Sequence, residues 1–275
     1  MAIKGVDISE HNGSVNFSTL KNNGVEFVII RLGYGSNYTN QDDKRFAENV
    51  KKAEAAGMPW GAYLYSYAKN TSMAKSEAEH ALRLLKGKTP LYGVWYDVED
   101  PQLSGVDVVA TSQTFCDAME NAGYYAGIYA SLSWLNGSLN SSKLDKYDKW
   151  VAQWNSSCTY KKAYGIWQYT DKLVIGGKNF DGNWAYKDYP SIIKAMNGET
   201  EEEDDEMLTY DQWKDYMERY EQEKAKEKVS SWAKDAVEFV QKEGLMNGDA
   251  DGSFRPQSFI TRQEVAAVLK NEHDK

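Results

Sequence analysis

The regular alternation of short apolar runs with helix-like segments constrains the fold of this 275-residue chain more than any other feature. Apolar runs typical of β-strands cover residues 25–32, 60–67, 91–96, 124–129, 150–154 and 164–169. Three segments with helical patterns, 43–56, 72–86 and 111–122, each stop at a glycine, the residue that most often follows a helix. Strands that alternate with helices predict parallel βα units.

The last third of this region departs from the alternation. After residue 129 the helical stretches shorten, and residues 149–186 look like consecutive strands joined by turns at Gly165, Gly176-Gly177 and Gly182. We therefore expect an α/β fold, a modified TIM-like (β/α) barrel that lacks some helices in its last third, with a small all-α domain at the C-terminal end.

Carboxylates stand at the ends of several predicted strands. Asp97 and Glu99 are two residues apart, so on a strand they share one face, and crowding favours the protonated form of one of them. A protonated carboxyl near neutral pH is what a general acid for glycosidic bond cleavage requires, although a pair of solvated acids is the alternative for this segment alone. Asp7 ends the strand at residues 5–9, and Asp181 follows the apolar run 173–175. In a βα barrel such strand ends form the active site.

Aromatic residues are frequent, with 9 Trp, 19 Tyr and 8 Phe, and they suit a sugar-binding cleft because sugar rings stack on aromatic faces. Phe27, Trp60 and Trp150 lie inside apolar runs and are expected in the core. Five others lie near predicted strand ends and are expected in the cleft: Tyr34, Tyr63, Tyr65, Tyr129 and Trp154. Gln168 and Arg31 are candidates for hydrogen bonds to substrate, and Arg31 equally suits a buried partner for one of the acids.

Other chemistries lack their residue patterns. His11, His80 and His273 are scattered without zinc-site spacing, although His11 is close enough to Asp7 to line a cleft. Cys116 and Cys158 read as free thiols, and there is no glycine-rich phosphate loop. We expect neither a metal nor a cofactor.

Many short motifs, in one order from residue 5 to 186, resemble the glycoside hydrolase family 25 lysozymes, the Chalaropsis-type muramidases of bacteria and their phages. They are Gly-Val-Asp-Ile-Ser at 5–9, Val-Ile-Ile-Arg at 28–31 before Gly-Tyr-Gly at 33–35, Gly-Ala-Tyr-Leu-Tyr at 61–65, Tyr-Asp-Val-Glu at 96–99, Gly-Ile-Tyr at 127–129, Trp-Val-Ala-Gln-Trp at 150–154 and Trp-Gln-Tyr at 167–169. The resemblance implies that the chain cleaves peptidoglycan between N-acetylmuramic acid and N-acetylglucosamine.

The same resemblance implies a role for each acid. Glu99 is the implied general acid/base, Asp97 stabilises the positively charged intermediate or orients the substrate acetamido group, and Asp7 and Asp181 complete an acidic floor. A retaining enzyme can use a carboxylate nucleophile or the substrate's own 2-acetamido group, and we favour the second route. A chitinase-like hydrolase and a noncatalytic glycan-binding protein are the alternative functions.

Charge divides the chain into two parts. Residues 1–198 carry 21 Lys and Arg against 20 Asp and Glu, so the remaining 11 basic and 21 acidic residues give the C-terminal part a net charge of −10. This balance argues against nucleic acid as a partner. The acidic run 199–206 predicts a linker. We therefore expect a catalytic barrel at 1–196, a linker at 197–208 and a helical domain at 209–275.

The C-terminal part begins with a predicted helix at 209–228, which has Thr209 as N-cap and Gln212 in the capping-box position. Its aromatic stripe of Trp213, Tyr216, Met217 and Tyr220 must be covered by the barrel, by the following domain or by another copy of the chain.

A second helix at 232–243, the loop at 247–256 and the helix start at 260–264 resemble an S-layer homology repeat, a cell-wall anchoring module. That family usually packs three repeats together, and this chain has one, so wall polysaccharide binding implies an assembly of chains or an adapted repeat. Asp249, Asp251 and Ser253 mimic an EF-hand loop, but Ile260 stands where the bidentate Glu belongs, so we expect no EF-hand calcium site.

The chain starts directly with the first strand, without an apolar signal segment or a run long enough to insert into a membrane. We therefore expect a product of the host cytoplasm that acts on the cell wall after release, as a phage endolysin does. Export by another route is the alternative.

Overall fold

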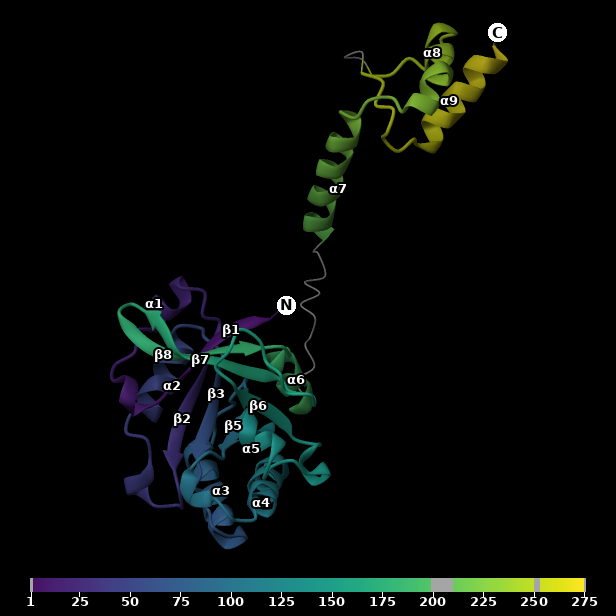
Figure 1. Ribbon diagram of the computed structural model, residues 1–275. Coiled ribbons are helices and arrows are strands. Elements are labelled where there is room, and N and C mark those ends of the chain that lie inside the picture. The colour runs from purple at the N-terminus through teal and green to yellow at the C-terminus, as the bar shows by residue number, and fades with distance from the viewer. Residues whose placement is uncertain (1, 199–209, 250–252, 275) are drawn as a thin grey trace. The chain divides into compact units, whose positions relative to one another are not determined.

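The computed structural model describes residues 2–198, 210–249 and 253–274 (Figure 1). Its contacts divide the chain into two compact units, with the boundary between residues 201 and 202. The predicted acidic linker at 199–206 lies outside the described residues, as does Thr209.

The first unit is a closed barrel whose strands follow one another in chain order. They are β1 (Ile3–Ile8), β2 (Phe27–Tyr34), β3 (Trp60–Tyr65), β4 (Val94–Asp97), β5 (Ala126–Ser131), β6 (Asp148–Ala152), β7 (Ile166–Ile175) and β8 (Lys178–Ala185). Strands β1 to β7 pair in parallel, and β8 runs antiparallel to both β7 and β1. The prediction of a modified (β/α) barrel is confirmed.

Helices cover the outside of the earlier strands, while the β7–β8 hairpin has no helix in its connection (Figure 1). They are α1 (Phe17–Asn22), α2 (Phe46–Ala55), α3 (Thr71–Leu85), α4 (Val108–Asn121), α5 (Leu132–Asn136) and α6 (Tyr189–Met196). The three predicted helices correspond to α2, α3 and α4. The helix α2 begins three residues later than predicted because the carboxylate of Asp43 is used to bind the loop around it.

Two predictions for the last strands are wrong. Asp181 does not follow a strand but lies inside β8, and the apolar run 173–175 is the end of β7. Gly182, predicted in a turn, is also a strand residue, and its missing side chain makes room for the ring of Tyr169, which a Cβ would approach to 2.9 Å. The turn between the two strands uses only Gly176 and Gly177, both with positive φ.

Alternation along the strands separates two cores. Outward residues such as Val28 and Ile30 pack against the helices, while the inward residues Phe27, Trp95 and Trp150 fill the barrel. Small and large residues complement each other inside, because a Cβ on Gly5 or Gly127 would lie 2.3 Å from the ring of Phe27 or Trp95. The predicted core residues Phe27, Trp60 and Trp150 are all buried.

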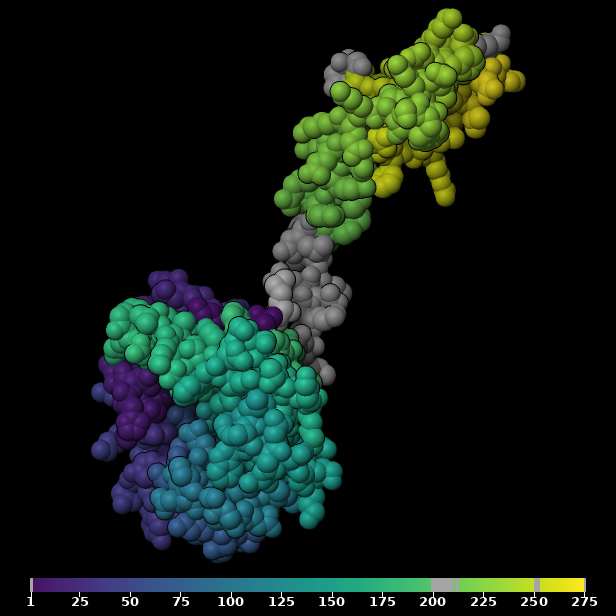
Figure 2. All heavy atoms as spheres, viewed as in Figure 1, coloured from purple at the N-terminus to yellow at the C-terminus, as the bar shows by residue number. Residues whose placement is uncertain are grey.

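The β7–β8 turn folds back onto the segment that follows β1. In the space-filling view its green atoms lie on the purple atoms of the N-terminal region (Figure 2). The Lys178 ammonium donates to the carbonyl oxygens of Asn12 at 3.2 Å and Ser14 at 2.6 Å. The last strand is thereby fixed to the loop that leads away from Asp7.

The second unit contains α7 (Tyr210–Ala225), α8 (Lys234–Lys242) and α9 (Arg262–His273). Thr261 and Glu264 form a capping box at the start of α9. The capping role predicted for Gln212 and the loop residue Asp251 fall outside what the structure describes. None of the residues described between 210 and 274 is buried. In the described part of the chain, no helix combines the length and the apolar character needed to cross a membrane.

Candidate active site

One end of the barrel carries the four predicted acids. Asp7 lies near the end of β1, Asp97 is the last residue of β4, and Glu99 follows it by two positions. Asp181 reaches the same place from β8 because the antiparallel register sets it directly opposite Asp7. Asp7 and Asp97 are only 7% and 3% exposed, whereas Glu99 is half-buried.

Burial raises the pKa values of all four acids above their ordinary range, and the charges of neighbouring acids add to the rise. For Asp7 the main cause is desolvation, followed by the charge of Asp181. Desolvation and the charge of Glu99 raise the pKa of Asp97 in the same way. The pKa of Asp181 is raised to about 6, by burial and then by Asp171.

The pKa of Glu99 is also raised, chiefly by burial. The neighbouring Tyr129 hydroxyl opposes this rise, and the charges of Asp181 and Asp100 add to it. Glu99 therefore keeps its proton to a higher pH than an exposed glutamate does, which suits a general acid.

Gln168 connects the acids to the aromatic residues. Its Nε2 donates to Asp7 Oδ2 at 2.9 Å, and its Oε1 accepts from the Tyr129 hydroxyl at 3.0 Å and from Trp154 Nε1 at 3.1 Å. Asn183 donates to the same Asp7 oxygen at 2.8 Å. These bonds fix the orientation of Asp7 and of two predicted substrate contacts.

Asp97 is the least satisfied of the acids. Its Oδ1 is buried and has no hydrogen-bond partner in the described protein. Because buried polar atoms are nearly always hydrogen-bonded, an orphaned oxygen in a cleft suits a donor from a bound molecule.

The predicted cleft aromatics differ in exposure. Tyr129 is buried, and its ring packs 4.5 Å from that of Trp150. Tyr63 is half-buried against the same indole, at 6.1 Å between centroids. Trp154 is 60% exposed although its indole nitrogen is held by Gln168. It therefore presents a fixed, solvent-facing ring next to the acids.

A hollow of about 420 Å³ adjoins the acids on the side of β1 to β3. It is lined by Glu10, His11, Arg31, Tyr34, Tyr65 and Tyr67. Tyr65 links this hollow to the acids, because its hydroxyl donates to Asp100 Oδ2 at 3.2 Å and both Glu99 and Asp97 raise its pKa after burial does.

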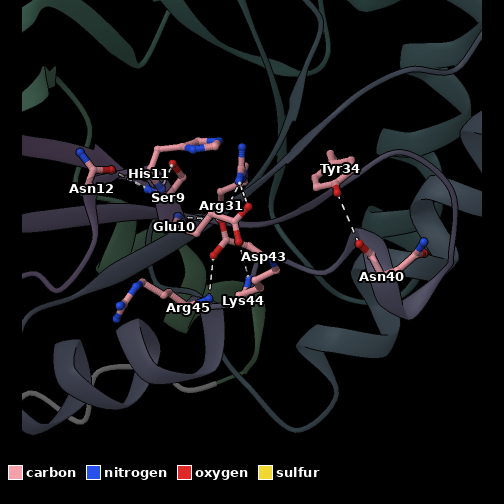
Figure 3. Close-up of polar contacts among 10 residues, drawn as sticks. All are labelled: Ser9, Glu10, His11, Asn12, Arg31, Tyr34, Asn40, Asp43, Lys44 and Arg45. Carbon is pink, nitrogen blue, oxygen red and sulfur yellow. Dashed lines mark hydrogen bonds and ion pairs between the residues drawn. The ribbon is translucent and has the colours of Figure 1, made fainter.

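Arg31, which lines this hollow, lies between two carboxylates (Figure 3). Its Nε donates to Asp43 Oδ2 at 2.9 Å and its Nη2 to Glu10 Oε1 at 3.3 Å. Asp43 also accepts the backbone N–H of Glu10, at 2.9 Å. Arg31 is thus the buried partner of acids, but of Glu10 and Asp43 rather than of the predicted catalytic set; a direct contact with substrate stays a prediction.

The model of the glycosyl hydrolases family 25 matches residues 6–178, more than half of the chain. The chain belongs to this family. A model of the S-layer homology domain matches residues 226–266.

Two curated relatives of this family 25 chain are lysozymes. The autolytic lysozyme of Clostridium acetobutylicum is 30% identical over 177 residues, which are 64% of this chain and 52% of that protein. Lysozyme M1 of Streptomyces globisporus is 30% identical over 198 residues, covering 65% of each chain. The chain therefore spans about half the length of the first relative.

Solved structures share the barrel. The modular autolysin LytC from Streptococcus pneumoniae is 31% identical with a TM-score of 0.60, covering 67% of this chain and 47% of that one. The catalytic domain of endolysin ply40 from bacteriophage P40 of Listeria monocytogenes is 30% identical with a TM-score of 0.60, covering 70% of this chain and 98% of that one.

Sequence reasoning missed several polar residues of this family 25 site, among them Asn183, Asp43, Asp100 and Glu10. Asn183 was identifiable, because it lies two positions after Asp181 and so shares its face of β8. Asp43 and Asp100 lie in loops, where no periodicity indicates direction. In the described residues, no group of three or more His, Cys, Asp or Glu side chains is arranged to hold a metal ion.

Proposed function

We propose that this family 25 chain is a peptidoglycan hydrolase that cleaves the β-1,4 bond between N-acetylmuramic acid and N-acetylglucosamine with retention of configuration. The observation that carries the proposal is the cluster of the buried Asp7 and Asp97 with the half-buried Asp181 and Glu99, whose pKa values are all raised. The names of the lysozyme relatives support the substrate class.

In the proposed reaction Glu99 protonates the glycosidic oxygen as the bond to the leaving sugar breaks. The carbonyl oxygen of the substrate 2-acetamido group attacks C1 and forms a cyclic oxazolinium ion. Glu99, now ionised, then takes a proton from water as the water attacks C1, which regenerates the acetamido group and retains configuration.

Asp97 suits the substrate-assisted route. Its unpartnered Oδ1 can accept the acetamido N–H, which orients the carbonyl oxygen toward C1 and stabilises the positive charge of the cyclic ion. The competing route is direct attack by a carboxylate. A glycosyl ester trapped on Asp97 or Asp181 and detected by mass spectrometry would refute substrate assistance.

Digestion of purified Gram-positive cell walls tests the function. Borohydride reduction and mass spectrometry of the fragments are expected to show reduced muramic acid ends with the wild type and none with Glu99→Gln. Glu120→Gln, a surface change on the outside of the barrel, is the matched control and should leave the products unchanged. Reduced glucosamine ends would instead indicate chitinase-like specificity, and lysis by Glu99→Gln would exclude Glu99 as the acid.

We further propose that the second unit binds secondary cell-wall polysaccharide as an assembly of three chains. Its support is the match to an S-layer homology domain together with large apolar side chains at the surface, such as Trp232 at 87% exposure and Phe239 at 58%. A surface of this kind is unusual for a protein that stays monomeric.

Light scattering on the full chain tests the assembly, with a trimer expected at micromolar concentration. Trp232→Ser with Phe239→Ser should give monomers, whereas Tyr38→Ser, an equally exposed aromatic of the barrel unit, should stay trimeric. A wild-type monomer would contradict the assembly.

The likeness to an endolysin catalytic domain supports a product made in the host cytoplasm that acts on the wall after release.

A further inference from the structure

His80 is buried in the first unit at a distance from the acids. It lies in the middle of α3, with 0% of its surface exposed, and its ring packs against the strand residue Gly33. A Cβ on Gly33 would approach His80 Cε1 to 2.8 Å, so the ring occupies the space that a side chain would need. The imidazole thus lies between α3 and the loop that joins β2 to α2, and it contacts that loop directly.

Both ring nitrogens of His80 face oxygen atoms of that loop. Nδ1 lies 3.0 Å from the carbonyl oxygen of Gly35, and Nε2 lies 2.7 Å from Asp42 Oδ1. A carbonyl oxygen only accepts hydrogen bonds, and so does an ionised carboxylate. A neutral imidazole has one N–H, so in either tautomer one ring lone pair would face an oxygen lone pair at hydrogen-bond distance.

Asp42 is held in its ionised form. Arg83 binds it with two parallel hydrogen bonds, from Nη1 at 3.0 Å and from Nη2 at 2.6 Å. Burial alone raises the pKa of Asp42, but the hydrogen bonds from Arg83 and His80 outweigh it and hold the pKa below its usual value.

We infer that His80 carries a proton on each ring nitrogen and acts as a positioning residue that fixes the β2–α2 loop against the substrate cleft. Asp42 from the loop faces the ring, and Arg83, also on α3, binds the same carboxylate oxygen as His80 Nε2. Glu77, one turn earlier on α3, is turned away toward Ser66 and Tyr96. The strand β2 contributes only glycine at this contact.

Each end of the loop connects His80 to the cleft. Gly35 follows Tyr34, which lines the 420 Å³ hollow, and its N–H donates to the carbonyl oxygen of Tyr65 at 2.9 Å. At the other end, Asp42 precedes Asp43, whose carboxylate holds Arg31 and the backbone of Glu10 (Figure 3). Fixing Gly35 and Asp42 therefore fixes three residues of the hollow: Glu10, Arg31 and Tyr34.

The protonation state is measured directly by NMR on the full chain labelled with ¹⁵N-histidine. At pH 7.5 the two ring nitrogens of His80 are expected to show the shifts of protonated nitrogen, with the signals assigned by their loss in His80→Gln. The exposed His11 and His273 serve as internal references in the same spectrum. A neutral His80 with one unprotonated nitrogen would overturn the inference.

Two variants separate the effect of the Asp42 carboxylate on His80 from the effect of Arg83. Asp42→Asn places an amide N–H donor within reach of Nε2, so His80 is expected to become neutral with its proton on Nδ1. Arg83→Gln removes the second partner of the same carboxylate and should leave His80 doubly protonated. A His80 that stays doubly protonated in Asp42→Asn, or that becomes neutral in Arg83→Gln, would contradict the role of Asp42.

The positioning role rests on the proposed muramidase function and has its own readout. For wild type, KM for soluble peptidoglycan fragments is expected to rise about tenfold at the alkaline pH where NMR shows His80 losing a proton. The readout is KM, because the alkaline fall of kcat/KM also reports the ionisation of Glu99. In Asp42→Asn the KM should not change across that pH. An unchanged wild-type KM would overturn the positioning role, whereas a lack of any cleavage would refute the proposed function and leave the NMR result standing.

Discussion

Asp7 and Asp181 are opposite each other in the antiparallel register of β1 and β8. Burial and the charge of Asp181 hold the pKa of Asp7 well above its usual range. The closeness of the two carboxyl groups therefore disfavours the state in which both are ionised.

This pair makes the barrel less stable as the pH rises. Above about pH 4 the unfolded chain has released the protons of its aspartates, but an acid with a raised pKa still holds its proton in the folded state. The folded state therefore loses stability as the pH rises through the folded pKa, which is about 6 for Asp181. Asp181→Asn is therefore expected to raise the free energy of unfolding by about 1 kcal/mol at pH 7.5, a value discounted for the partial exposure of this side chain. Urea denaturation checks this, and the gain should vanish at pH 4.

The alkaline limb of the activity profile reports Glu99. The acid must be protonated to act, so activity is expected to fall as the pH rises through its raised pKa. Asp181 contributes to that raised pKa, and Asp181→Asn should shift the alkaline limb of kcat/KM to lower pH. Asp171→Asn, which removes a charge that acts on Asp181 but not on Glu99, should leave the limb in place. If the alkaline limb does not move in Asp181→Asn, the charge of Asp181 does not raise the pKa of Glu99.

Replacing Gln168 is expected to lower activity more than the loss of a single substrate contact would. Gln168→Met has a similar volume but frees Asp7, Tyr129 and Trp154 from their common partner, so kcat/KM is expected to drop about 10- to 100-fold. Steady-state kinetics on soluble fragments checks this, with Gln113→Met on α4 as the control. Equal activity of the two variants would mean that the orientation of these groups is unimportant.

Trp154 should bind substrate through its exposed ring. Trp154→Ala is expected to raise KM with little change in kcat, because stacking on the ring contributes on the order of 1 kcal/mol in the ground and transition states alike. The control is Tyr186→Ala, because Tyr186 is also exposed but follows β8 at the opposite end of the barrel. A fall in kcat with constant KM would assign Trp154 to the chemical step.

The sequence predicted the barrel and its acidic end because strand periodicity and glycine stops are local signals. The positions of Asp7 and Asp97 at one end of the barrel agree with the sequence patterns, since each lies at the end of a parallel strand, within the motifs at 5–9 and 96–99. The direction of β8 was not predicted, because Gly176 and Gly177 indicate a turn without saying that the strand after it pairs with β1. Asp181 was thus expected after a strand, although it faces the cleft from inside one.

The partners of Arg31 also escaped prediction. Its inward position follows from the alternation along β2, but the choice between substrate and a buried acid depends on which loop folds over the barrel mouth. That loop carries Asp42 and Asp43 and is held by α3 through His80, a contact between segments 38 positions apart. No pattern within either segment encodes it.

The pairing of the first strand with the last affects how the barrel folds during synthesis. Asn183 and Asp7 are 176 positions apart, yet they share a hydrogen bond across the seam that closes the barrel. During synthesis, β1 must wait for β8 to emerge from the ribosome, and until then the growing sheet has an open edge. Because Asp181 lies on that final strand, a nascent chain remains without its complete set of acids until the seam has formed.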